Sequence, residues 1–181
     1  MTNLPNTLTI LRIAAVPAIV LLAVFGGQAG SYPAAAVFIA AGLTDWLDGF
    51  LARRLKQESV VGAILDPIAD KFQVSITLLV LLWLGALPGW NLIPASAILG
   101  REIIVSGLRE GMASKNMPRI SSSFAAKSKT VFQMAALTIL LVGTLPGSWA
   151  PQVGYALLWF AALMSIWTGF IYLRTALLTL R

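Results

Sequence analysis

Four aspartates are the residues of this sequence whose type and spacing most clearly indicate chemistry. Asp45 and Asp48 are three residues apart, and Asp66 and Asp70 are four apart, so each pair projects from one face of a helix. Their neighbours are largely apolar, and carboxylates at membrane depth are costly and usually mark function. Two such pairs on neighbouring helices can bind hard divalent cations, which prefer oxygen ligands. The alternative is a set of helix-end carboxylates, solvated at the membrane surface or paired with nearby basic residues.

The aspartates belong to a longer pattern of eight defined positions within 26 residues. It reads Asp45-x-x-Asp48-Gly49-x-x-Ala52-Arg53, eight further residues, and then Gly62-x-x-x-Asp66-x-x-x-Asp70. At every defined position it resembles the signature of the CDP-alcohol phosphatidyltransferase family. The resemblance implies that family's fold and the transfer of a phosphatidyl group from CDP-diacylglycerol to an alcohol.

The resemblance also implies roles for the residues of this pattern. Asp45, Asp48 and Asp66 would bind two divalent cations, and Asp70 would complete the metal cluster and act as the general base. The chain contains no His and no Cys, so metal chemistry has to use carboxylates, which suits Mg²⁺ or Mn²⁺. The CDP-diacylglycerol site implied by the pattern consists of Asp48, Gly49, Ala52, Arg53 and Gly62. Close helix packing is the alternative role of the small residues.

Polar residues also precede the first apolar span. Pro5-Asn6 favours a turn, and Asn6 can cap a helix that starts near residue 8, after a short interfacial segment. The Pro-Asn-x-Leu-Thr-x-x-Arg pattern of residues 5–12 resembles the N-terminus of the family, which implies that Asn6 and Thr9 approach the nucleotide. Capping and contact with lipid headgroups are the alternative for these residues and for Arg12.

Two basic stretches are candidates for binding the acceptor substrate. Arg101 and Arg109 are separated by two helical turns and share a face. The runs 100–110 and 126–134 resemble the branch of the family whose acceptor is sn-glycerol 3-phosphate, although Ala126 stands where those relatives usually have Gly. The resemblance implies that the acceptor phosphate contacts Arg101, Arg109, Lys127 and Lys129. Ion pairing with the neighbouring glutamates and anchoring to anionic lipid are the alternatives.

Composition places these candidate residues in an integral membrane protein. Of 181 residues, 58% are hydrophobic and only 11% are charged, whereas a soluble domain carries about 25% charged residues. The net charge of +6 is compatible with nucleic-acid binding, but in so apolar a chain we expect it to act at the membrane, and we predict no nucleic-acid partner.

The distribution of charge predicts the elements that position the site. Three spans without charge, residues 13–44, 72–100 and 130–173, are each interrupted by a Gly- and Pro-rich break near residues 26–33, 85–91 and 143–151. A membrane helix needs about 20 residues, so each span is expected to cross the membrane and return. The prediction is an all-α fold of six transmembrane helices, near 8–26, 33–56, 60–85, 91–113, 126–143 and 152–174.

We therefore expect a single membrane domain, residues 1–181, whose termini and aspartates face the cytoplasm because Lys and Arg favour that side. The resemblance implies a bacterial inner-membrane enzyme, a homodimer, that converts CDP-diacylglycerol and glycerol 3-phosphate to phosphatidylglycerophosphate and CMP. The alternatives are another acceptor within the family (phosphatidylglycerol, inositol phosphate or serine), a metal-dependent prenyltransferase, or a cation transporter.

Overall fold

The structure is a computed structural model that describes residues 4–55, 60–114, 124–143 and 150–179, without the side chains of 4–6, 28, 46–55, 60, 61, 63, 124–127 and 179. The described residues form six α-helices, one 3₁₀ turn and no strand, so the prediction of an all-α fold is confirmed. The elements are α1 (Leu4–Phe25), α2 (Gly27–Leu55), α3 (Val60–Trp83), η1 (Gly89–Asn91), α4 (Leu92–Ser114), α5 (Phe124–Val142) and α6 (Ala150–Thr179).

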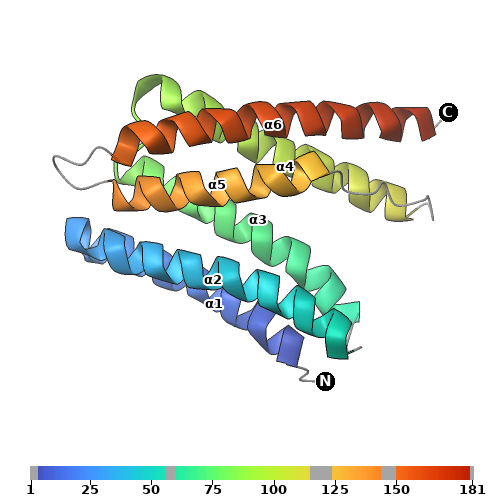
Figure 1. The fold of residues 1–181 in the computed structure, drawn as a ribbon, viewed down its shortest axis with the longest axis horizontal. Coiled ribbons are helices and arrows are strands. Elements are labelled where there is room, and N and C mark those ends of the chain that lie inside the picture. Colours follow the sequence, from blue (N-terminus) through green and yellow to red (C-terminus); the bar gives the residue numbers. More distant parts are fainter. Residues whose placement is uncertain (1–3, 56–59, 115–123, 144–149, 180–181) are drawn as a thin grey trace.

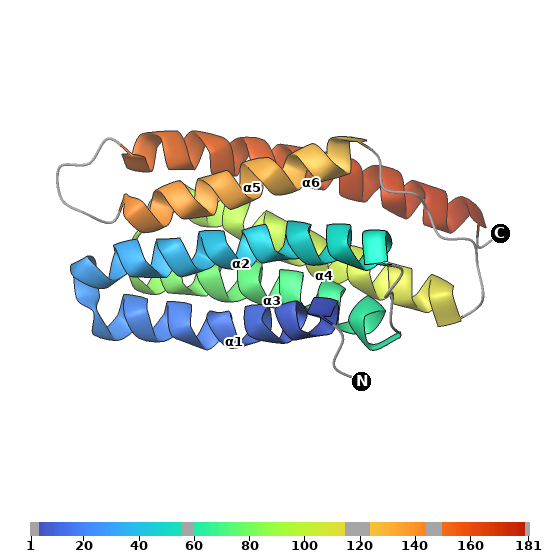
Figure 2. The same cartoon turned by 60° about the horizontal axis from the view of Figure 1, so that its bottom comes forward.

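The six helices form an elongated bundle in which successive helices run in opposite directions (Figures 1 and 2). The start of α1, the end of α2, the start of α3, the end of α4, the start of α5 and the end of α6 all lie at one end of the bundle. The ends of α1, α3 and α5 and the starts of α2, α4 and α6 lie at the other end. Charged residues far apart in the sequence are thereby gathered at one end, as the charge-free spans predicted.

The reversal between α1 and α2 is much tighter than expected. Instead of a loop over residues 26–33, only Gly26 separates the two helices, and Gly27 adopts a φ of 54°, which favours glycine. A Cβ on Gly30 would lie 1.8 Å from the carbonyl oxygen of Leu22, so only glycine lets α2 start this close to α1. Pro33 therefore lies inside α2 rather than at its start.

The predicted turn at Pro5-Asn6 was wrong, because α1 already begins at Leu4. Proline is compatible with the first turn of a helix, where its missing N–H has no intrahelical acceptor. The interfacial segment expected before residue 8 is therefore the first turn of α1 itself.

Large apolar side chains cover the outside of the bundle as well as its core. Each helix contributes to an apolar centre; the fully buried side chains include Ile19, Phe38, Leu81, Ile98, Leu137 and Leu158. Ile103 and Trp167, by contrast, are 72% and 62% exposed, as expected for side chains that face lipid.

Three described segments are long and apolar enough to cross a membrane, namely Thr7–Phe25, Gly89–Ser114 and Ala150–Leu178. The chain is thus a multi-pass membrane protein. The crossing of the bilayer by all six helices remains a prediction.

A layer of charge lies inside the bundle, away from its uncharged end. Arg12 on α1, Asp70 on α3 and Lys129 on α5 are each thirteen residues from the uncharged end of their helix. At 1.5 Å per residue this is about 20 Å. The hydrocarbon core of a bilayer is about 30 Å thick, so a bundle that spans it places these charges well below the surface. Side chains at this depth need partners or a ligand.

Candidate active site

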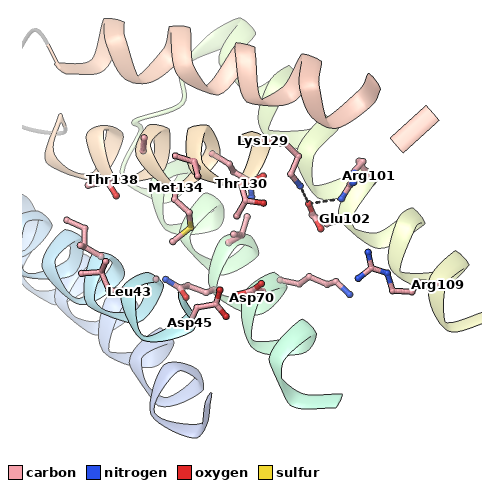
Figure 3. Close-up of a pocket in the computed structure, with 18 residues that line it drawn as sticks. Leu43, Asp45, Asp70, Arg101, Glu102, Arg109, Lys129, Thr130, Met134 and Thr138 are labelled. Carbon is pink, nitrogen blue, oxygen red and sulfur yellow. Dashed lines mark hydrogen bonds and ion pairs between the residues drawn. The ribbon is translucent and has the colours of Figure 1, made fainter. Parts of the chain in front are cut away.

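A cavity of about 730 Å³ opens within this charged layer, between α2, α3, α4 and α5 (Figure 3). Asp45 from α2 and Asp70 from α3 line one wall. The opposite wall contains Arg101 and Arg109 from α4 and Lys129 from α5. Five residues that the sequence assigned to a site thus surround one cavity. Carboxylates and cations face each other across it.

The acidic wall is held together by an arginine from α1. Arg12 is 1% exposed, and its Nη1 lies 2.5 Å from a carboxylate oxygen of Asp45 and 3.4 Å from one of Asp70. The carboxylate side chains are 42% and 53% exposed, so they remain accessible from the cavity. A single buried guanidinium therefore fixes two motif aspartates from different helices next to each other.

Two further contacts connect the helices that form this wall, although Thr9 and Asp66 are not among the residues that line the cavity. The Thr9 hydroxyl donates a hydrogen bond of 2.6 Å to the carboxylate of Asp66. Gln73, 2% exposed, donates from Nε2 to the Phe38 carbonyl at 3.0 Å and so ties α3 to α2 one turn from Asp70. Thr9, predicted to approach the nucleotide, thus contacts one of the predicted metal ligands.

For several predicted site residues the structure describes the backbone only. The backbones of these residues lie on α1, α2 and α5, but their surroundings and any side chains are outside the described part: Asn6, Asp48, Gly49, Ala52, Arg53 and Lys127. Gly62 is described and is buried near the start of α3. Their roles stay predictions.

The described part of the acidic wall fits a divalent cation in its donor chemistry. Two carboxylate oxygens contact the same cationic nitrogen of Arg12, so they already converge on a positive charge. Hard cations such as Mg²⁺ bind this type of oxygen donor. Among the residues whose side chains are described, no group of three or more His, Cys, Asp or Glu is arranged to hold a metal ion. The side chain of Asp48 is not described, so the described aspartates make up only part of the predicted metal cluster.

The cationic wall is organised around Glu102. Its Oε1 accepts hydrogen bonds from Lys129 Nζ and, at 3.2 Å, from Arg101 Nη1 (Figure 3). Lys129 is 4% exposed, so its charge is compensated mainly by this carboxylate. Glu102 thus forms the ion pair with Arg101 that the ion-pairing alternative expects, and the role of these cations in binding the acceptor stays a prediction. Two cations around one carboxylate still leave a net positive charge facing the cavity.

Helix α6 supports the cationic wall from behind. Nη2 of Arg101 lies 3.5 Å from Oγ1 of Thr168, and the Arg109 guanidinium lies 5.9 Å from the centre of the Tyr172 ring. The second distance permits a cation–π contact. No role in the site was predicted for the aromatic residues of α6, because such residues are equally typical of lipid-facing positions.

The remaining lining is mixed. Lys71, Thr130 and Gln133 add polar groups, and Ile39, Leu43, Val131 and Met134 add apolar ones. A ligand with both a charged and an apolar part therefore matches this lining.

Arg12 is a main contributor whose role was left open by the sequence, between the nucleotide site implied by the N-terminal pattern and capping or contact with lipid headgroups. Its membership of the Pro-Asn-x-Leu-Thr-x-x-Arg pattern was the available signal, since an arginine inside an apolar helix requires a partner. Lys71, a basic residue that follows Asp70 in the sequence, also lines the cavity and was not predicted as a site residue.

The helical fold and this cavity define a multi-pass membrane protein with an acidic wall facing a cationic one. The signature of the CDP-alcohol phosphatidyltransferase family matches residues 2–167, and the chain belongs to this family. The chain is 42% identical over 177 residues to a CDP-diacylglycerol–glycerol-3-phosphate 3-phosphatidyltransferase of Pseudomonas fluorescens, covering 96% of this chain and 90% of that protein. It is 39% identical over 175 residues to the Escherichia coli K12 protein of the same name, covering 96% and 94%. An Arabidopsis thaliana chloroplastic/mitochondrial relative is 41% identical over 95% of this chain and 62% of its own length.

Proposed function

We propose that this protein transfers the phosphatidyl group of CDP-diacylglycerol to sn-glycerol 3-phosphate, releasing CMP. The observation that carries this proposal is a cavity with carboxylates on one wall and cations on the other. The donor contributes a pyrophosphate, which requires metal, and the acceptor contributes a phosphate, which requires basic groups. The names of the relatives support the same pair of substrates.

The acidic wall is proposed to hold the donor. Asp45, Asp48, Asp66 and Asp70 would bind two divalent cations, Mg²⁺ or Mn²⁺, which neutralise the pyrophosphate and the leaving CMP when bound. The donor's cytidine would lie along the segment from Gly49 to Gly62 and near Asn6 and Thr9. The apolar part of the cavity lining supports a site that is open to the lipid portion of the donor.

The cationic wall is proposed to hold the acceptor. Glycerol 3-phosphate carries about two negative charges near pH 7, like other phosphomonoesters. Arg101 and Arg109 line the cavity on α4, and an arginine can grip a phosphate with two hydrogen bonds. Lys129 contributes its charge from a position fixed by Glu102, and Lys127 is one helical turn away from the cavity-lining Thr130.

The transfer itself needs a base between the two walls. In the proposed reaction the 1-hydroxyl oxygen of the acceptor bonds to the β-phosphorus, and the bond from this phosphorus to the CMP oxygen breaks. Asp70 accepts the hydroxyl proton, and CMP leaves with the bonding electron pair. A free carboxylate with a pKa near 4 is a weak base for an alcohol, so positioning has to supply much of the rate.

The same proposal includes the setting of the enzyme. The charged end of the bundle, with both termini, would face the cytoplasm of a bacterial inner membrane. The chain would act as one domain and as a homodimer. Glycerol 3-phosphate would then reach the cationic wall from the water, and CDP-diacylglycerol would enter from the bilayer.

Purified protein in detergent, supplied with CDP-diacylglycerol and Mg²⁺, tests the proposal through CMP release and the mass of the lipid product. We expect phosphatidylglycerophosphate with glycerol 3-phosphate as acceptor and no product after EDTA treatment. A preference for phosphatidylglycerol, inositol phosphate or serine in the same assay would change the acceptor but retain the family reaction. Product formation in metal-free protein would contradict the proposed metal site.

A further inference from the structure

The acceptor wall has a support on α6 that does not itself line the cavity. Arg101 is only 15% exposed in its side chain, and its aliphatic part lies against the backbone of α6 at Gly169. A Cβ built on Gly169 would come 2.9 Å from Arg101 Cγ and 3.6 Å from its Nε. The absence of a side chain at Gly169 therefore creates the space in which Arg101 lies.

The guanidinium group of Arg101 is held by two polar contacts. Nη1 donates to Glu102 at 3.2 Å, and Nη2 lies 3.5 Å from the hydroxyl of Thr168, the residue before Gly169. Nε is buried without a hydrogen-bond partner in the described part of the chain, so packing rather than hydrogen bonding fixes this section of the side chain. Glu102 and α6 together determine where the guanidinium faces the cavity.

We propose that Gly169 is a positioning residue for the acceptor and acts through Arg101. The inference rests on the proposed function, because it gives Gly169 a role in binding the phosphate of glycerol 3-phosphate. A methyl group at Gly169 has to displace Arg101 from its Cγ outward. Bidentate binding of a phosphate depends on the direction of the guanidinium, so a small displacement weakens it. The competing role for a helix glycine, close packing between helices, predicts a loss of stability without any preference for one substrate.

A double-mutant cycle with a packing control separates these roles. The variants are Gly169→Ala, Arg101→Ala, their combination, and Gly154→Ala as the control. Gly154 is also on α6, and a Cβ there would come 2.7 Å from the Leu140 side chain, a comparable clash. It is fifteen residues, or about 22 Å, nearer the uncharged end.

For each variant, KM is measured separately for glycerol 3-phosphate and for CDP-diacylglycerol. A 1 Å misplacement of a group that positions a substrate can cost about a hundredfold in activity. For the small displacement of the Arg101 guanidinium, we expect Gly169→Ala to raise KM for glycerol 3-phosphate about tenfold. KM for CDP-diacylglycerol should stay unchanged. In the Arg101→Ala background the same substitution should add nothing, because the side chain that it displaces is gone. Gly154→Ala should leave both constants unchanged.

If Gly169→Ala yields too little folded protein, Thr168→Val replaces it in the same cycle. This substitution keeps the shape of the side chain and removes the hydroxyl near Nη2, so we expect about a twofold rise in the same KM, again absent in the Arg101→Ala background. The inference is overturned if the rises in KM for glycerol 3-phosphate multiply in the double variant, or if Gly154→Ala raises this KM as much as Gly169→Ala. Either result would leave the proposed function intact. A wild-type protein that does not use glycerol 3-phosphate would overturn the proposed function, and the inference with it.

Discussion

Replacing Arg12 by glutamine tests whether this buried guanidinium substitutes for metal charge in the acidic wall. Arg12 has a fully buried side chain, and it contacts Asp45 and Asp70 together. Removing one partner of a buried ion pair costs about 3–5 kcal/mol. The two carboxylates are 42% and 53% exposed, so water compensates part of this loss, and we expect a decrease of about 1–3 kcal/mol in the free energy of unfolding.

Thermal unfolding of the purified protein in detergent measures this loss. With EDTA present, Arg12→Gln should lower Tm by about 2–12 °C, since each kcal/mol corresponds to about 2–4 °C for a chain of this size. Addition of Mg²⁺ should raise Tm more in the variant than in the wild type, because a divalent cation then supplies the charge that the carboxylates have lost.

Arg174→Gln is the matched control, because Arg174 is an exposed arginine near the end of α6 and does not line the cavity. It should leave Tm within about 1 °C of the wild type, as for other surface substitutions. An Arg12→Gln variant as stable as the wild type in EDTA would refute the account of the acidic wall. So would a variant whose Tm responds to Mg²⁺ less than that of the wild type.

Three further predictions concern the cationic wall, the tight turn and the orientation. Glu102→Gln should destabilise the protein by about 3–5 kcal/mol in denaturant unfolding, because it leaves Arg101 and the buried Lys129 without their shared carboxylate, and adding Lys129→Met should restore part of this loss because the more deeply buried of the two cations is then removed; a further loss in the double variant would contradict the ion-pair assignment. Gly30→Ala should reduce the yield of folded protein severely, because its Cβ would overlap a carbonyl oxygen of α1, and near-normal yield and Tm would show that the turn can relax. The chain lacks cysteine, so Trp90→Cys, in η1 just before α4, and Ser114→Cys, the last residue of α4, carry unique labels at opposite ends of this segment. An impermeant thiol reagent should label the first in intact cells and the second only after permeabilisation, and the opposite pattern would reverse the orientation.

The gathering of the site at one end of the bundle could be predicted from sequence because charge is costly in a membrane. Once Asp45, Asp70, Arg101 and Lys129 were assigned to the same end of alternating helices, few arrangements kept them apart. The structure brings all four to one cavity. The residue types and spacing of the pattern in residues 45–70 also sufficed to indicate the family, since that information is local to a short stretch of sequence.

The contacts across helices could not be predicted in the same way. Arg12 reaches Asp70 across 58 positions in the chain, and neither residue's neighbours determine that pairing. The support of Arg101 by Gly169 depends on how closely α4 and α6 pack, and a glycine in an apolar helix has many possible reasons. The tight turn at Gly26 depends on a backbone approach that Gly- and Pro-rich composition indicates only as a break.

The most direct test of the two-walled cavity is the change in KM for each substrate caused by Arg101→Gln. Arg101 lines the cavity opposite Asp45 and Asp70 and is proposed to bind only the acceptor. Loss of one charged hydrogen-bond partner costs about 1.5–3 kcal/mol, or about ten- to a hundredfold in binding. The account predicts that KM for glycerol 3-phosphate rises by this factor while KM for CDP-diacylglycerol stays within about twofold, as both do in Arg174→Gln. An unchanged KM for glycerol 3-phosphate, or an equal rise for both substrates, would contradict the division of the cavity into a donor wall and an acceptor wall.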